Sequence, residues 1–194
     1  MHGLFNRALE CFLRDTYGAP LWRRVARDAG CPETFEALAP SDPDTPGRIV
    51  DAAGPAHAQP RGVLLEDLGT YLPTHPRQAR IRRLLRFGGV DFVDFLHSLE
   101  DLPGRARLAL PDLALPSIEL RAEGGGRYWL SSDCGADVGH VMIGLLRAMA
   151  DDYGALVVLE HEISPMGRMT LGIDLPAPRF AAGRRFDLAR QAAG

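Results

Sequence analysis

Apolar residues recur every three or four positions through the first half of the chain. Between Leu4 and Leu13 this spacing makes one wide apolar stripe, which predicts a buried helix face that ends before Gly18. The same spacing returns in later segments, which are separated by stretches rich in Pro, Gly and Asp. The sequence therefore predicts a helical first half, with helices over about residues 4–17, 21–29, 34–38, 46–53, 63–72 and 78–87.

One further helix organises the middle of the chain. Its apolar stripe runs from Phe92 to Leu102, and Asp91 stands where an N-cap residue is expected. Pro103 has no N–H to donate within a helix and Gly104 follows it, so we expect the helix to end there. The chain should then continue to Ser117 as an extended arm punctuated by proline.

Beyond this arm the apolar residues alternate with a period of two. Residues 118–121 and 128–131 alternate around a Glu-Gly-Gly-Gly turn, which predicts an antiparallel hairpin. A helix and two more strands are expected over residues 138–153, 156–159 and 169–173. The pattern therefore predicts an α+β fold, in which a small antiparallel sheet of about four strands and flanking helices follow a helical lobe.

Composition and charge narrow the class of protein. The 194 residues suffice for one domain, and no apolar run approaches the ~20 residues that span a bilayer. The three cysteines are scattered and no secretion signal is visible, so we expect a cytoplasmic protein. The net charge of −3 argues against nucleic acid as a partner.

A run of arginines precedes the organising helix. Such a run could contact phosphate groups, but on a chain with this acidic balance a solvated helix face is the favoured interpretation. The run comprises Arg77, Arg80, Arg82, Arg83 and Arg86.

Several stretches, in register over about residues 1–175, resemble the heme–nitric oxide/oxygen binding (H-NOX) family. The opening MHGLFNRALECFLRDTYG is similar to the start of that family. The other matches are Leu84–Gly88, Asp94–Leu96, Pro111, Pro116–Ser117 and Met142–Leu146. The resemblance implies a single domain over residues 1–175, with a helical lobe over about 1–72 packed on a heme-site lobe over about 73–175. Residues 176–194 would form a C-terminal tail.

The two chemical anchors of the family differ in this sequence. The resemblance places Pro103 where the family has the histidine that holds heme iron, and proline has no ligating atom. The family's Tyr-x-Ser-x-Arg motif, which clamps the heme propionates, falls on Trp129–Asp133, where Ser131 is retained and the Arg is missing. His140 or His97 could then be the metal ligand. For each of them, a histidine held by ordinary hydrogen bonds is the favoured alternative.

The same resemblance implies an apolar hollow that would hold heme. The residues expected at this cofactor site are Phe5, Leu9, Leu99, Pro116, Ser131, Val141 and Leu145. Val141 would lie over the distal heme face without a hydrogen-bond donor, which would favour nitric oxide over oxygen. The alternative is that these side chains fill one another's space as a dry core.

Two hypotheses of function follow from the resemblance. In the first, the chain is a heme-binding nitric oxide sensor domain that signals to a partner, such as a histidine kinase or a cyclic-nucleotide signalling enzyme. In the second, it is a heme-free interaction module or binds another apolar ligand. We do not expect an enzyme, because the sequence has no Gly-rich phosphate loop, nucleophile elbow, HExxH or CxxC motif.

Overall fold

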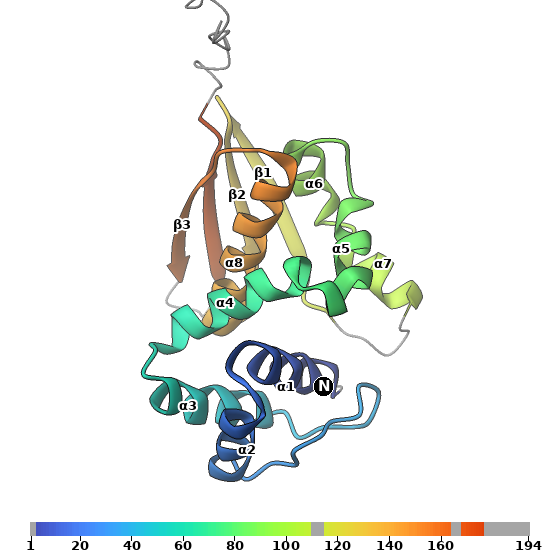
Figure 1. Cartoon of the computed structure of the whole chain (residues 1–194). Coiled ribbons are helices and arrows are strands. Elements are labelled where there is room, and N and C mark those ends of the chain that lie inside the picture. The colour runs from blue at the N-terminus through green and yellow to red at the C-terminus, as the bar shows by residue number, and fades with distance from the viewer. Residues whose placement is uncertain (1–2, 110–114, 164–167, 177–194) are drawn as a thin grey trace, which may run out of the picture.

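The computed structural model describes residues 3–109, 115–163 and 168–176. Helices gather in one lobe and a sheet with its flanking helices in the other, and α4 and α8 cross between them (Figure 1). The helices are α1 (Leu4–Tyr17), α2 (Ala19–Asp28), α3 (Thr45–His57), α4 (Arg61–Thr74), η1 (Pro76–Gln78, a 3-10 turn), α5 (Ala79–Arg86), α6 (Phe92–Ser98), α7 (Leu102–Ala109) and α8 (Ala136–Tyr153). The strands are β1 (Ile118–Gly124), β2 (Arg127–Ser132), β3 (Val158–Ile163) and β4 (Met169–Asp174).

The helical lobe has its own apolar core, to which α1, α2, α3 and α4 each contribute. Its largest fully buried side chains are Leu9, Phe12, Leu13, Trp22, Ile49, Leu64, Leu65 and Leu68. The loop after α2 is fastened to this lobe by Glu10, which is fully buried and accepts a hydrogen bond from the Phe35 N–H at 2.9 Å. Arg14 donates to the same carboxylate at 2.8 Å, so the buried charge is paired.

The second lobe is built on one sheet whose strands run in the order β1-β2-β4-β3, each pair antiparallel. Side chains alternate between its two faces, and Leu130, Leu171 and Ile173 are fully buried on one of them. α8 covers this face, which Figure 1 shows with the helix in front of the strands, and Leu146 and Met149 complete the core. No helix within the described residues is long and apolar enough to cross a bilayer.

α4 and α8 approach one another as closely as backbones can. A Cβ atom added to Gly69 would overlap the Val141 carbonyl oxygen, and one added to Gly144 would overlap the carbonyl oxygen of Glu66. The hydroxyl of Thr70 donates to the Gly144 carbonyl at 3.3 Å. Glycine is therefore required on both helices at this crossing.

Ion pairs secure the same crossing on its exposed side. The Arg61 Nε donates to Asp137 at 2.8 Å, and Arg147 donates to Glu66 at 2.5 Å. The hydrogen bond from the Arg61 guanidinium holds the pKa of the Asp137 carboxyl below its usual range. The two lobes are thus joined by one continuous helix contact.

The α+β class and most of the predicted elements are confirmed. The hairpin of β1 and β2 and the long helix α8 lie where the apolar periodicity placed them. Asp91 caps α6, because its carboxylate accepts a hydrogen bond from the Asp94 N–H at 2.9 Å.

Three local predictions were wrong, one in the loop after α2 and two at prolines that were expected to end a helix. Residues 34–38 form turns rather than a helix, since neighbouring side chains satisfy this loop's backbone; Trp22 Nε1, for example, donates to the Glu33 carbonyl at 2.8 Å. α3 continues through Pro55, and α4 contains Pro73 in its last turn.

The organising segment is also divided differently from the prediction. α6 ends at Ser98 and a second helix, α7, begins at Leu102. Pro103 therefore opens a helix rather than closing one, and its missing N–H costs nothing in a first turn. The expected extended arm is helical as far as Ala109, and Pro111 lies outside the described residues.

Candidate functional site

The apolar residues expected at the heme site divide between the two cores. Leu9 and Val141 belong to the helical-lobe core, with Phe5 packed against it. Leu99 and Leu145 belong to the core of the sheet lobe. Val141 and Leu145 are one turn apart on α8, so this helix brings the two groups together.

These side chains are closely packed. Leu9 and Leu99 keep only 1% and 0% of their surface accessible, and Val141 and Leu145 keep 8% and 7%. A side chain that borders a water-sized void retains accessible surface, so protein atoms cover these four almost completely. Phe5 is half-buried, and Pro116, just before β1, is half-buried as well.

Pro103 is buried at the start of α7. Its neighbour Leu102 packs against the core of the sheet lobe, and Arg105 ties α7 to α6 by donating to the Ser98 carbonyl at 2.9 Å. The position that the resemblance assigns to the iron ligand therefore carries a ring that can pack but has no lone pair to offer a metal.

The register of β2 separates Ser131 from the other candidate residues. Ser131 pairs with Glu119 and Thr170 and lies on the face of the sheet opposite α8. Its hydroxyl accepts a hydrogen bond from Arg168 at 3.1 Å. Trp129 lies on the same outer face, where it and Ser131 border an open surface depression. The structure thus does not bring Ser131 together with the apolar residues.

Sequence reasoning missed the residues that face inward from β2. Leu130, Ser132 and, just past the strand, Cys134 are buried, with the same spacing as Tyr-x-Ser-x-Arg. The Ser132 hydroxyl donates to the Ser117 carbonyl at 2.6 Å. In this register Leu and Cys replace the Tyr and Arg, so neither donor of a propionate clamp remains. Strand alternation, read outward from an apolar Leu130, could have identified this register.

The two candidate histidine ligands lie elsewhere. His97 is exposed on α6, and its ring meets Tyr128 edge-on at 6.1 Å between centroids. His140 is on α8 with its Nδ1 3.3 Å from Glu66 Oε1 on α4, and its ring is 5.1 Å from that of His161 on β3.

His140 is confined in this position. Its ring lies against α4 so closely that a Cβ on Gly62 would come within 2.6 Å of the ring carbon Cε1. The neighbouring His161 faces α8, and burial, reinforced by His140, lowers the pKa of His161. Glu160, by contrast, lies 3.5 Å from Arg127, so consecutive residues of β3 contact different partners. Within the described ranges, no three His, Cys, Asp or Glu side chains converge as a metal site would require.

The described architecture is that of a two-lobed α+β domain, in which α8 contributes apolar residues to the cores of both lobes. The model of the Haem-NO-binding family matches residues 2–161, and the chain belongs to this family, also called H-NOX. The resemblance found in the sequence is thereby confirmed. No curated protein matches the sequence.

Solved H-NOX structures share the fold at low sequence identity. An H-NOX protein from S. oneidensis in the Fe(II)NO state has a TM-score of 0.75 at 16% identity, covering 90% of this chain and 99% of that one. An unliganded Fe(II) H-NOX protein from K. algicida has a TM-score of 0.76 at 12% identity, covering 93% and 99%. A mutant H-NOX protein from T. tengcongensis has a TM-score of 0.75 at 15% identity, covering 93% and 100%.

Heme as the family holds it does not fit the residues of this chain. Pro103 supplies no axial ligand, and Leu130 and Cys134 supply no propionate donors. The walls that would contact the macrocycle, including Leu9 and Leu99, are already covered by protein atoms. The scaffold of the family is present, and its iron and propionate anchors are not among the described contacts.

Proposed function

We propose that this chain is an H-NOX signalling domain that acts through contact with a partner protein and does not hold a histidine-ligated heme. The observation that carries the proposal is the buried Pro103 at the start of α7, at the position that the sequence resemblance assigns to the family's iron ligand. H-NOX domains are sensor domains rather than enzymes and generally signal to kinases or cyclases, so a partner of this class in the cytoplasm is expected here too.

The connection between the lobes supports a signalling role. α4 and α8 touch through Gly69 and Gly144, and Glu66 receives both Arg147 and His140 across the same contact. A displacement of either helix must therefore move the other, because neither backbone has free space at the crossing. A bound partner can use such a contact without any cofactor.

A heme-binding nitric oxide sensor is the second candidate, and one observation favours it. The apolar side chains that the sequence resemblance assigns to the heme site lie in the two cores that share α8: Phe5, Leu9 and Val141 in one, Leu99 and Leu145 in the other. Apolar burial of a macrocycle can contribute several kcal/mol without an axial ligand. His140 contacts Glu66 through Nδ1, so its Nε2 is the nitrogen that could bind iron.

A hemin titration distinguishes the two candidates. We expect the purified protein to show no stoichiometric uptake and no sharp Soret band that shifts when nitric oxide is added. A gas-sensitive Soret band with one heme per chain would overturn the proposal in favour of the heme sensor. Its loss in His140→Ala, but not in His97→Ala, would then locate the ligand.

Restoring the anchors provides the converse test. Pro103→His combined with Cys134→Arg should raise hemin affinity at least about tenfold, because it supplies a ligand and a propionate donor. The matched control is Pro103→Ala with Cys134→Arg, which restores the cation without the imidazole. Equal affinity in both double variants would show that the lost ligand is not what excludes heme.

A further inference from the structure

α5 presents three chemically different sides. Successive residues of a helix are about 100° apart, so Arg80, Arg83 and Phe87 fall within one arc of about 60°. Leu85 lies on the opposite side and is buried at 3% exposure in the core of the sheet lobe. The arc that carries the two arginines and the phenylalanine therefore points directly away from the protein.

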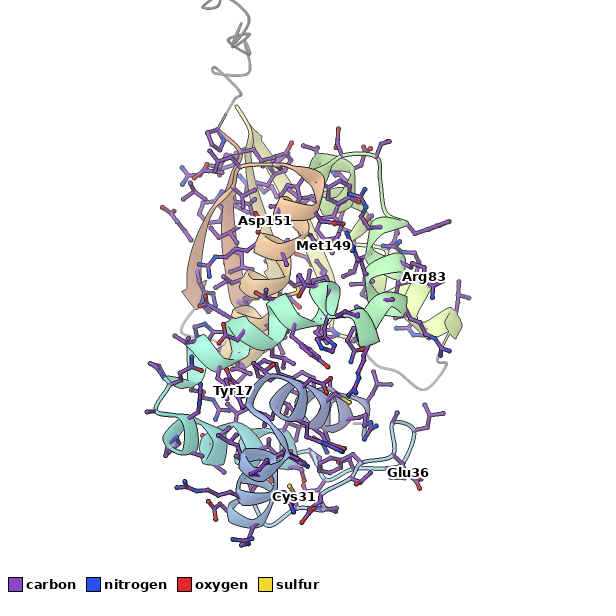
Figure 2. All side chains as sticks on the ribbon, viewed as in Figure 1. Tyr17, Cys31, Glu36, Arg83, Met149 and Asp151 are labelled. Carbon is purple, nitrogen blue, oxygen red and sulfur yellow. The ribbon has the colours of Figure 1, made fainter. Side chains whose placement is uncertain are left out.

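The third side of α5 fastens the helix to the protein. Arg82 and Arg86 both pair with Asp152 at the end of α8, and the Arg86 guanidinium lies 4.1 Å from the centroid of the Tyr153 ring. Arg80 and Arg83, in contrast, form no ion pair with any residue in the described ranges. Figure 2 shows Arg83 at the outer flank of the molecule, beside α5. Two of the four arginines of α5 thus anchor the helix, and the other two remain available to a ligand.

Two large apolar side chains extend this outward side. Phe87 is 85% exposed and Val90 is 92% exposed, on the loop that joins α5 to α6. The intervening Gly88 and Gly89 press against α6, because a Cβ on either would overlap Ser98 or Asp94.

The loop holds these apolar side chains outward. The Val90 N–H donates to the Asp94 carboxylate at 3.1 Å, and the Gly88 N–H donates to the Leu85 carbonyl at 3.1 Å. These two hydrogen bonds hold the backbone of the loop, and the Phe87 side chain beside it is 85% exposed. Exposing an aromatic ring to water is unfavourable for an isolated domain. An exposed ring beside arginines without ion pairs is typical of a binding surface.

We propose that the side of α5 formed by Arg80, Arg83, Phe87 and Val90, called here the α5 face, docks on an anionic phospholipid membrane. Phe87 and Val90 enter the interface between head groups and acyl chains, while Arg80 and Arg83 bind lipid phosphates. The inference goes beyond the proposed function and is independent of heme.

Charge and shape both favour lipid over other partners. The segment from Pro76 to Val90 contains five arginines and no acidic residue. The nearest carboxylates that follow, Asp91 and Asp94, are engaged with backbone N–H groups of the same loop and helix. Phe87 and Val90 are almost fully exposed, so they form a convex tip rather than a groove. An apolar tip with Arg80 and Arg83 behind it matches the order of acyl chains and phosphates in a bilayer.

Vesicle sedimentation tests the proposal with the full chain. At low ionic strength the protein should bind vesicles of phosphatidylcholine mixed with phosphatidylglycerol and should not bind vesicles of phosphatidylcholine alone. Arg80→Gln with Arg83→Gln should weaken this binding about tenfold or more, because each cation near an anionic surface contributes to affinity. Phe87→Ser with Val90→Ser should also weaken it about tenfold, and added salt should weaken it further.

A matched control removes the same charge elsewhere. Arg23→Gln with Arg24→Gln changes two exposed arginines on α2 and should alter binding less than about twofold. A second readout is Phe87→Trp, whose fluorescence should shift to the blue when anionic vesicles are added, as expected for a ring that leaves water.

Three results would overturn the proposal. They are no binding of the wild-type chain to anionic vesicles, unchanged binding in both α5 variants, and an equal loss in the α2 control. Absence of vesicle binding would leave an acidic protein surface as the partner of the α5 face.

Discussion

The α4–α8 crossing and the Pro103 region depend on different properties of their residues: the crossing on small size, and the region around Pro103 on ligating and hydrogen-bonding atoms. At the crossing, Gly69 and Gly144 serve shape alone, since any larger residue would displace a backbone. Around Pro103, holding heme as the family does requires an atom that binds iron and groups that donate hydrogen bonds to the propionates. Pro103, Leu130 and Cys134 do not supply them. The whole scaffold survives at 12–16% identity to solved H-NOX proteins. Packing tolerates many sequences, whereas coordination chemistry can be lost through a few substitutions.

The largest expected effect lies at the crossing. Gly144→Ala should destabilise the protein by more than about 3 kcal/mol or prevent folding, because its Cβ would overlap the Glu66 carbonyl oxygen. The measurement is urea unfolding followed by circular dichroism. Gly104→Ala is the matched control: no atom lies within 4 Å of its added Cβ, so it should be neutral or stabilising by up to about 1 kcal/mol. Similar stabilities for the two variants would contradict the close contact of α4 and α8.

The next effect tests whether the expected heme site is a packed core. Leu99 is fully buried, so Leu99→Ala should lower the unfolding free energy by about 2–5 kcal/mol. The same urea experiment measures it. A decrease in the unfolding free energy of less than about 1 kcal/mol would mean that Leu99 borders empty space. That result would favour the hypothesis of a heme-binding sensor.

A smaller effect distinguishes the two serines of β2. Ser132→Ala should cost about 1 kcal/mol, because it removes the hydrogen bond that the buried Ser132 hydroxyl donates to the Ser117 carbonyl. Ser131→Ala, on the outer face, should change stability by less than about 0.5 kcal/mol. The reverse order of the two values would restore the register expected from the sequence, with Ser131 facing the heme site.

The smallest effect is a pH dependence that arises from Tyr71 in the helical lobe. Burial, together with its bond to Asp15, raises the pKa of Tyr71 to about 12. Because this pKa exceeds that of an unfolded tyrosine, the stabilisation is complete below about pH 10 and is lost as pH rises toward 12. Unfolding free energies measured between pH 9 and pH 11, about one unit on either side of the unfolded pKa, should therefore fall less for Tyr71→Phe than for the wild type. Parallel pH curves for the two proteins would contradict this assignment.

Much of the fold could be predicted from local pattern, and the site could be predicted only in part. Periodicity located α1, α5 and α8 and the hairpin, because a buried face imposes its repeat on the sequence. Pro103 could be recognised as a residue without ligating atoms from its identity alone. The break between α6 and α7 could not be predicted, because Pro103 is equally compatible with the end of one helix and the start of another.

The sequence alone thus determined the α+β class, the H-NOX resemblance and the absence of a ligand atom at Pro103. Tertiary structure decided which serine faces inward, because a shift of one residue on a strand exchanges its two faces. It also decided that His140 meets Glu66, 74 residues away in the chain, and that Phe87 faces solvent. Residue identity sets which chemistry is available, while packing between distant segments sets where each side chain can use it.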